Sequence, residues 1–155
     1  MKKYLNIIAA LFLAVVCSSC LERNLEELDT YDGKEITSIA GVYYRYYDSG
    51  IIDASGEQAV KQVSLSVSNT QIDAEAGTCS LNVAVPTNFP ASEAGKVNVR
   101  ELVVIVNIST AAIIRPIDGA PAFGTPGDWS KPNRYLIKAA DGGQQEWTVS
   151  LTLKQ

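Results

Sequence analysis

The sequence predicts an all-β fold, namely an antiparallel β-sandwich of about seven strands with Greek-key connections. From Glu35 onward, apolar and polar residues alternate with a period of two, which places successive side chains on opposite faces of a strand. Turn residues separate these runs at short intervals, and no stretch keeps a helical period. Without the leader described below, the chain is long enough for one such domain and too short for two.

Three strands are predicted in the first part of this domain, at residues 42–47, 63–68 and 79–85. In the last two of them one face is apolar and the other polar, as in a strand with one buried and one solvated side. Turn residues at 76–78 and 86–95 interrupt the pattern. A bulge at Gly41 could exchange the two faces of the first strand.

Three further strands are predicted in the second part. Residues 102–108 are continuously apolar, which indicates an inner strand or one covered on both faces. Residues 135–139 and 147–153 alternate, and Asp141-Gly142-Gly143 between them predicts a hairpin turn. Trp147 has the phase of the apolar residues in its strand and is therefore assigned to the core.

Residues 1–19 are predicted to be a cleaved lipoprotein signal peptide. Lys2 and Lys3 precede an apolar run of about ten residues, whereas a membrane-spanning helix needs about 20. Cys20 follows two small serines and is the predicted lipidation site, as in the bacterial lipobox. Cys17 is the weaker acceptor because a branched residue precedes it. The alternative is an ordinary cleaved signal without a lipid.

Residues 20–34 are predicted to form an acidic, flexible tether, and residues 35–155 the β-sandwich domain. An acidic stretch behind a lipidated cysteine resembles the surface-export signal of Bacteroides-type outer-membrane lipoproteins. A solvated spacer that holds the domain off the bilayer is the alternative. The expected location is the outer membrane, with a lipid anchor and the domain at the cell surface or facing the periplasm.

Charge and residue types exclude several function classes. The signal holds two of the 13 basic residues and none of the 17 acidic ones, so the mature chain carries 11 positive against 17 negative groups, or −6. This balance offers no surface for nucleic acid, and membrane attachment would rest on the acyl chains. The chain has no histidine, which removes the common catalytic triads and the usual zinc ligand.

No enzyme activity, metal or cofactor is predicted from the remaining groups. Cys79 has the phase of its apolar strand neighbours, which predicts a buried, inert thiol and leaves the mature domain without a disulfide. The carboxylates are the only candidates for a hydrolytic pair, and all lie in or beside turns, where Asp is ordinary turn chemistry. Nothing in the spacing couples any two of them: Asp118, Asp128, Asp141 and Glu146.

The candidate binding residues are Tyr43, Arg45, Tyr47 and Trp129. In a strand, Tyr43, Arg45 and Tyr47 share one face, and two phenol rings beside a guanidinium make an amphipathic platform for a sugar, a peptide or a protein. The alternative is that these side chains cover an exposed sheet and stack on cross-strand neighbours. Trp129 lies between turn residues, where it either closes one end of the sandwich or faces a ligand.

The last third of the chain resembles a known class of domain. Four segments carry the likeness: residues 112–116, 124–132, 135–142 and 146–149. They are similar to the Ig-like or cadherin-like β-sandwich modules of Bacteroides-type surface lipoproteins, which close with an Asp-aromatic-Ser segment, a Tyr-containing strand, an Asp-Gly turn and an aromatic-Thr-Val strand. The resemblance implies an Ig-like sandwich and says little about function, because proteins of many roles share the module.

Two function hypotheses follow. In the first, the protein is a membrane-anchored lipoprotein whose non-catalytic domain binds a glycan or a protein partner, as an accessory to nutrient uptake. In the second, it is a structural spacer or an assembly subunit of the cell envelope with no small-molecule ligand. An exposed aromatic patch at Tyr43, Arg45 and Tyr47 would favour the first, and a face covered by the chain's own loops would favour the second.

Overall fold

The computed structural model describes residues 30–52 and 54–154. The predicted signal peptide, the lipidation site Cys20 and most of the predicted tether lie outside the described residues. The compact unit that contains the domain begins at Tyr31. Its first residues contact the sandwich, since the carbonyl of Tyr31 accepts a hydrogen bond from the backbone N–H of Asp141 at 3.2 Å. Residues 31–34, which the sequence assigns to the tether, are thus part of the folded unit.

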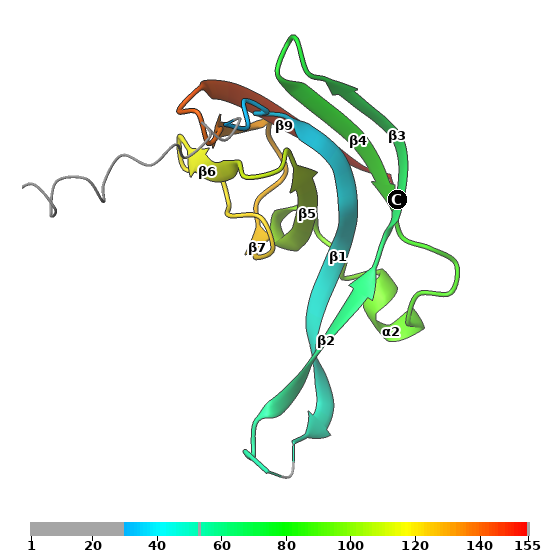
Figure 1. The fold of residues 1–155 in the computed structure, drawn as a ribbon. Helices are drawn as coiled ribbons and strands as arrows, with labels where there is room; N and C mark the ends of the chain where they lie inside the picture. The colour runs from blue at the N-terminus through cyan, green and yellow to red at the C-terminus, as the bar shows by residue number, and fades with distance from the viewer. Residues whose placement is uncertain (1–29, 53, 155) are drawn as a thin grey trace, which may run out of the picture. The chain divides into compact units, whose positions relative to one another are not determined.

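The fold is all-β, as predicted, and its strands form two sheets (Figure 1). The first sheet has the strand order β2 (Gln58–Ser64), β1 (Ile36–Ile51), β5 (Leu102–Ile108) and β7 (Pro126–Gly127). The second has the order β3 (Ser66–Asp73), β4 (Thr78–Ala84), β9 (Gln144–Lys154), β8 (Asn133–Lys138) and β6 (Ile113–Ile117). The described residues thus contain nine strands rather than about seven.

One strand pair departs from the predicted antiparallel arrangement. β4 and β9 run parallel, with Thr78 opposite Thr148 and Ala84 opposite Lys154, whereas every other pair in the described sheets is antiparallel. A hairpin forces its two strands to be antiparallel, but no hairpin joins β4 to β9. The described residues have two short helical segments, α2 (Ala91–Ala94) and η1 (Val99–Glu101). Within the same ranges, no helix has the length and hydropathy of a membrane span.

Three large aromatic rings fill the centre of the core, and each satisfies its polar atom. Trp129, Trp147 and Tyr135 are fully buried. The indole N–H of Trp129 donates to the carbonyl of Leu102 at 2.9 Å, and that of Trp147 donates to the carbonyl of Lys34 at 3.0 Å. The hydroxyl of Tyr135 donates to a loop carbonyl at 2.9 Å. Because buried polar atoms are costly without partners, these bonds fix the rings in place.

The predicted strand at residues 63–68 is wrong as a single element. The chain stays extended there, but β2 ends at Ser64 and β3 begins at Ser66 in the other sheet. Leu65 lies between them, buried, with its backbone N–H donating to the carbonyl of Val42 at 2.9 Å. Alternation survives this crossing because an extended chain keeps its period of two when it passes from one sheet to the other.

Two bulges in β1 set which side chains face the core. The register against β5 shifts between Ile36 and Ser38 and again between Ile39 and Gly41. Each extra residue reverses the inward face, so that Ile36, Ile39 and Val42 all pack on the core. After the second bulge Tyr44 points inward and Tyr43, Arg45 and Tyr47 point outward, which are the faces predicted without an exchange.

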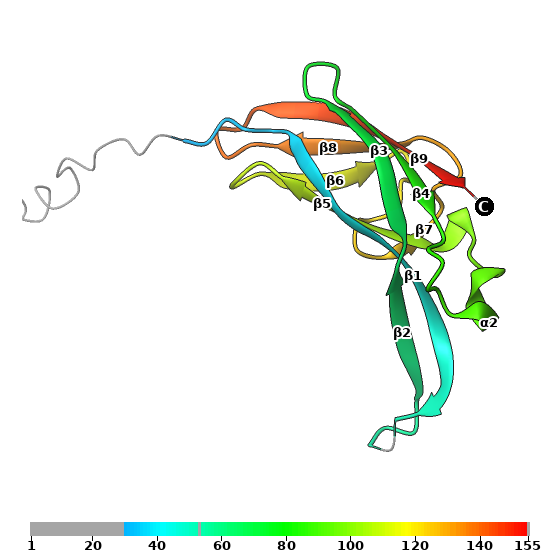
Figure 2. The same ribbon diagram turned by 90° about the vertical axis from the view of Figure 1, so that its right-hand side faces the viewer.

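The far part of β1 leaves the sandwich. β1 has 16 residues and its neighbour β5 has 7, and their pairing ends where Tyr44 lies opposite Leu102. Beyond that point β1 pairs only with β2, from Arg45 opposite Gln62 to Ile51 opposite Gln58. Residues 45–52 and 54–62 therefore form a two-stranded hairpin that projects from the sandwich, here called the arm (Figures 1 and 2).

Candidate functional site

Tyr43 is held against its own strand. A Cβ at Gly41 would lie 2.7 Å from the hydroxyl oxygen and 2.8 Å from Cε2 of Tyr43, so the ring covers the glycine. An aromatic ring laid over a strand glycine restores packing that the missing side chain cannot provide. Tyr43 is half-buried as a result. Tyr43 therefore matches the alternative interpretation of this face, in which the side chains cover the sheet and do not form a binding platform.

Arg45 is also engaged within the domain. Its Nε donates to Oε1 of Gln62 at 2.7 Å across the β1–β2 pair. One of its terminal nitrogens donates to the carbonyl of Gly124 at 3.2 Å, in the loop before β7. The guanidinium therefore ties the base of the arm to a loop of the sandwich.

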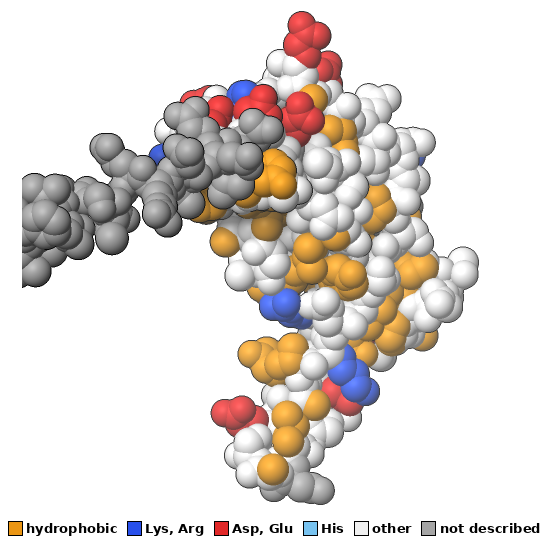
Figure 3. Space-filling model, in the orientation of Figure 1, with side chains coloured by type: hydrophobic (Ala, Val, Ile, Leu, Met, Phe, Trp, Pro, Cys, Tyr) orange, Lys and Arg blue, Asp and Glu red, His pale blue; other side chains and the backbone are white. Residues whose placement is uncertain are grey.

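Tyr47 is the predicted site residue that remains free. It is 72% exposed and lies directly opposite Val60, which is 58% exposed. Toward the tip, Ile51 is 64% exposed and Ile52 is 45% exposed. Figure 3 shows hydrophobic side chains along the projecting hairpin, with single charged groups among them. Such a gathering on a narrow element is unusual for a surface with no partner.

Trp129 does not join these residues. It lies in the core with no exposed surface, in contact with the rings of Phe123 and Tyr135. Its centroid is 5.7 Å from that of Phe123, a separation typical of packed aromatic pairs. Of its two predicted placements the structure shows the packed one, and a ligand at the surface would not reach the ring.

A hollow of about 690 Å³ lies beside β1 where the arm begins. This size falls within the range of small ligand sites. Its lining combines the arm with residues from the α2–η1 region and the β7 strand: Tyr44, Arg45, Tyr46, Tyr47, Val60, Glu93, Lys96, Glu101 and Pro126. Two of the four predicted site residues, Arg45 and Tyr47, are in this set.

The inner wall of the hollow is aromatic and acidic. The rings of Tyr44 and Tyr46 stack with centroids 6.2 Å apart, and Phe89 lies behind Tyr44 at 6.3 Å. Burial raises the pKa of Tyr44, and the carboxylates of Glu101 and Glu93 raise it further while Lys96 opposes them. After burial, the two carboxylates therefore have more effect on the pKa of Tyr44 than the lysine has.

The two carboxylates at this wall differ in their partners. Glu93 is bridged to Lys96 at 2.9 Å, and this contact raises the pKa of Lys96. Among the described residues Glu101 makes no ion pair, and it is exposed. Sequence reasoning did not include Tyr46, Glu93 or Glu101 in the site. Only Tyr46 had a signal, its place in the aromatic run; the acids are about 50 residues away in the chain.

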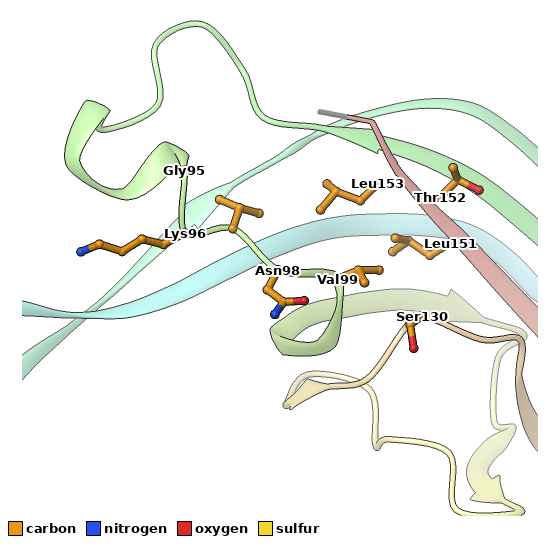
Figure 4. A pocket seen from close by; sticks show the side chains of 9 residues that line it. Gly95, Lys96, Asn98, Val99, Ser130, Leu151, Thr152 and Leu153 are labelled. Carbon is orange, nitrogen blue, oxygen red and sulfur yellow. The ribbon is translucent and has the colours of Figure 1, made fainter.

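A second hollow of about 750 Å³ lies between the α2–η1 connection and the end of β9. Figure 4 shows Leu151 and Leu153 of β9 near Val99, while the side chain of Lys96 extends away from them. The rest of the lining is uncharged and includes Ser130 and Thr152. This hollow therefore brings no pair of acidic or basic groups together.

The carboxylates considered as a hydrolytic pair all have structural partners. Asp118 and Glu146 both bond the guanidinium of Arg134 on the exposed face of the second sheet, a link that the sequence did not indicate. Asp128 accepts from the backbone N–H of Ser130 at 2.9 Å, and hydrogen bonds from Ser130 lower its pKa. Asp141 accepts from the N–H of Gly143 at 2.7 Å within the predicted hairpin turn.

The described residues offer no cluster of three or more His, Cys, Asp or Glu side chains that could hold a metal ion. Cys79 is buried, and burial raises its pKa from 9.0 to about 11. The thiol is therefore neutral at physiological pH, where a reactive cysteine would be ionised.

The two-sheet domain places this chain in a class of all-β proteins, and sequence comparison identifies the family. The chain belongs to the DUF5018-related family, whose model matches residues 36–150. It is 38% identical to a Bacteroides fragilis protein inferred to be secreted, whose crystal structure is known. That similarity covers 80% of this chain and 98% of the other, with a TM-score of 0.70.

A second solved structure, of a Bacteroides thetaiotaomicron protein inferred to be a glycoside hydrolase, is 17% identical. It covers 86% of this chain and 28% of the other, and its TM-score of 0.41 is too low to support any conclusion about fold or activity. No curated protein matches the chain.

Proposed function

We propose that this protein is a non-catalytic lipoprotein of the outer membrane that binds a glycan or a protein partner through the base of its arm, as an accessory to nutrient uptake. The observation that carries the proposal is the hollow beside β1, where Tyr46 and the exposed ring of Tyr47 lie near Glu101. Aromatic rings beside a few polar groups are the usual composition of a binding site.

Anchoring at Cys20 and display at the cell surface are part of the same proposal. The leader pattern supports them, as does the similarity to a Bacteroides fragilis protein inferred to be secreted. The chain enters the sandwich at Tyr31 and the arm lies at the other end of β1. Residues 36–44 of β1, which precede the arm, span about 30 Å, so the base of the arm is separated from the entry point by that length of strand.

Binding is tested with the detergent-solubilised full-length chain on a glycan array and on a displayed library of random twelve-residue peptides. Tyr47→Ala is expected to lower the affinity for the recovered ligand about tenfold. Ile113→Ala is the matched control, because Ile113 is 57% exposed on β6 of the other sheet. Equal affinity of both variants, or the absence of any ligand at millimolar concentration, would contradict the proposal.

The location is tested separately, by protease treatment of intact cells that express the full-length chain. Surface display predicts loss of the domain from wild-type cells. Cys20→Ala is expected to release the protein from the membrane fraction. Protection of the wild-type domain in intact cells would place it on the periplasmic side, and unchanged fractionation of the variant would exclude the lipid at Cys20.

The structural spacer is the second candidate. It is favoured by the internal contacts of Tyr43 with Gly41 and of Arg45 with Gln62 and Gly124, which use two of the three platform residues. The exposed Tyr47 and the hollow beside it have no explanation in a spacer.

A further inference from the structure

The main-chain groups of the arm point alternately toward β2 and away from it. The carbonyl of Val42 accepts from Leu65 on the β2 side, and the carbonyl of Val104 in β5 accepts from Gly124, away from β1. In an antiparallel pair these directions make Tyr43 and Val103 the residues that exchange hydrogen bonds between β1 and β5. With a period of two, the N–H and C=O of Arg45 and Tyr47 point to the same side as those of Tyr43.

That side has no neighbouring strand at Arg45 and Tyr47. Pairing with β5 ends at Tyr44, since the chain before Leu102 turns into η1. Among the described residues, β1 beyond Tyr44 pairs only with β2. Beside the non-hydrogen-bonded pair of Tyr44 and Leu102, the N–H of Arg45 faces the carbonyl of Glu101, whose own N–H donates to Asn98. The carbonyl of Arg45 and both main-chain groups of Tyr47 are therefore open at one edge, and the hollow lies at this edge.

Only another extended backbone matches a row of alternating N–H and C=O groups at strand spacing. A glycan hydroxyl can meet one of these groups, but it lacks the repeat. The arm itself also favours a third strand, because a two-stranded hairpin is marginally stable alone. These points favour a polypeptide over a glycan as the occupant.

The two walls of the hollow define which side chains would fit. On the inner wall, Tyr46 and the unpaired carboxylate of Glu101 match a Lys or Arg, which would combine ion pairing with contact to a ring face. On the outer side, Tyr47 and Pro126 match an apolar side chain. Neighbouring residues of a strand point to opposite faces, so these two side chains would be adjacent in the partner's sequence.

We propose that the free edge of β1 at Arg45 and Tyr47 binds an extended polypeptide segment as an added strand, with a basic residue toward Glu101 and an apolar residue toward Tyr47. This inference rests on the proposed function and narrows its partner to a polypeptide. A second copy of this chain fits poorly, because two-fold pairing at this edge would bring two unpaired Glu101 carboxylates together.

The test uses the peptide recovered from the random library and the full-length wild-type chain. Each backbone nitrogen of the peptide is methylated in turn, which removes one N–H without changing a side chain. Strand addition predicts that affinity falls about fivefold to tenfold at every second position and little in between. Because the protein is unaltered, misfolding cannot produce this pattern.

Protein variants give a second measurement. Tyr47→Pro removes the N–H that faces the free edge and leaves the β2 side unchanged, whereas Tyr47→Ala removes only the ring. The proline variant is expected to bind at least about fivefold more weakly than the alanine variant. Glu101→Gln is expected to lower the affinity for the peptide and to make this affinity less dependent on salt concentration. Glu75→Gln, at the exposed β3–β4 turn, is the matched control.

The outcomes separate this inference from the proposed function. A flat methylation profile together with equal binding by the two Tyr47 variants would overturn strand addition while leaving a side-chain site at Tyr47. Recovery of glycans alone would overturn the polypeptide partner but not the site. A ligand whose affinity is unchanged by Tyr47→Ala would overturn both the strand addition and the proposed binding site.

Discussion

The two halves of β1 share one strand and have opposite environments. From Ile36 to Tyr44 the strand pairs with β5, and its inward side chains are among the most buried in the domain. From Arg45 to Ile51 it has β2 as its one neighbour, and its apolar side chains are largely exposed. The sandwich half is therefore explained by stability, whereas the arm half needs another explanation, for which we propose binding.

The largest expected difference in stability between the two halves is that between alanine variants of Tyr44 and Tyr47, three positions apart in β1. Tyr44 is 6% exposed and packs on Tyr46 and Phe89, so Tyr44→Ala is expected to lower the free energy of unfolding by about 3 to 5 kcal/mol. Tyr47→Ala is expected to change it by less than about 0.5 kcal/mol. Urea denaturation of the full-length chain measures both, and equal losses would remove the distinction between the halves.

The buried thiol of Cys79 makes the stability of the sandwich depend on pH above its ordinary pKa. Its pKa is 9.0 ordinarily and about 11 in the fold, so the unfolded chain loses this proton first as pH rises. The contribution is complete below pH 9 and is lost between pH 9 and about 11. Urea denaturation at pH 8 and pH 11 should show a smaller loss of stability for Cys79→Ala than for the wild type. Identical losses would show that the thiol is not buried.

A smaller effect is expected where the sandwich half ends. Tyr43→Ala uncovers Gly41 and removes a half-buried ring, which is expected to cost about 1 kcal/mol. Gly41→Ala should be at least as destabilising, because the new methyl group would displace the ring. If Tyr43→Ala leaves stability unchanged but abolishes ligand binding, the ring belongs to the binding surface instead.

An effect of similar size is expected for Arg45, which connects the halves. Arg45→Ala removes hydrogen bonds to Gln62 and Gly124, and the expected loss of global stability is about 0.5 to 1.5 kcal/mol. Amide hydrogen exchange should speed up more in the arm than in the sandwich, since the arm is the less stable unit. Uniform acceleration across the domain would show that Arg45 supports the whole fold.

Much of the fold could be predicted from alternation and turn residues alone. β4, β5, β8 and β9 lie within three residues of the expected strands at both ends, and the turn at Asp141-Gly142-Gly143 joins β8 to β9. The crossing at Leu65 was invisible because alternation does not report which sheet a strand joins. β6 was missed since it is a short edge strand that contains Pro116.

The candidate site was only partly predictable, for a different reason. The faces of Tyr43, Arg45 and Tyr47 follow from a period of two, so their common orientation could be read from the sequence. The free edge depends on β5 being shorter than β1, and the acidic wall depends on where the chain folds residues 93–101 against the arm. Neither a difference in length between two strands nor a contact between residues far apart in the chain produces a pattern in the local sequence.

Amide hydrogen exchange at single-residue resolution, on the full-length chain without ligand, tests the central claim most directly. A free edge predicts that the amide of Tyr47 exchanges rapidly, while those of Tyr44 and Tyr46, bonded to β2, are protected. Protection of Tyr47 equal to that of Tyr46 would mean that the edge is already occupied, and would contradict the account.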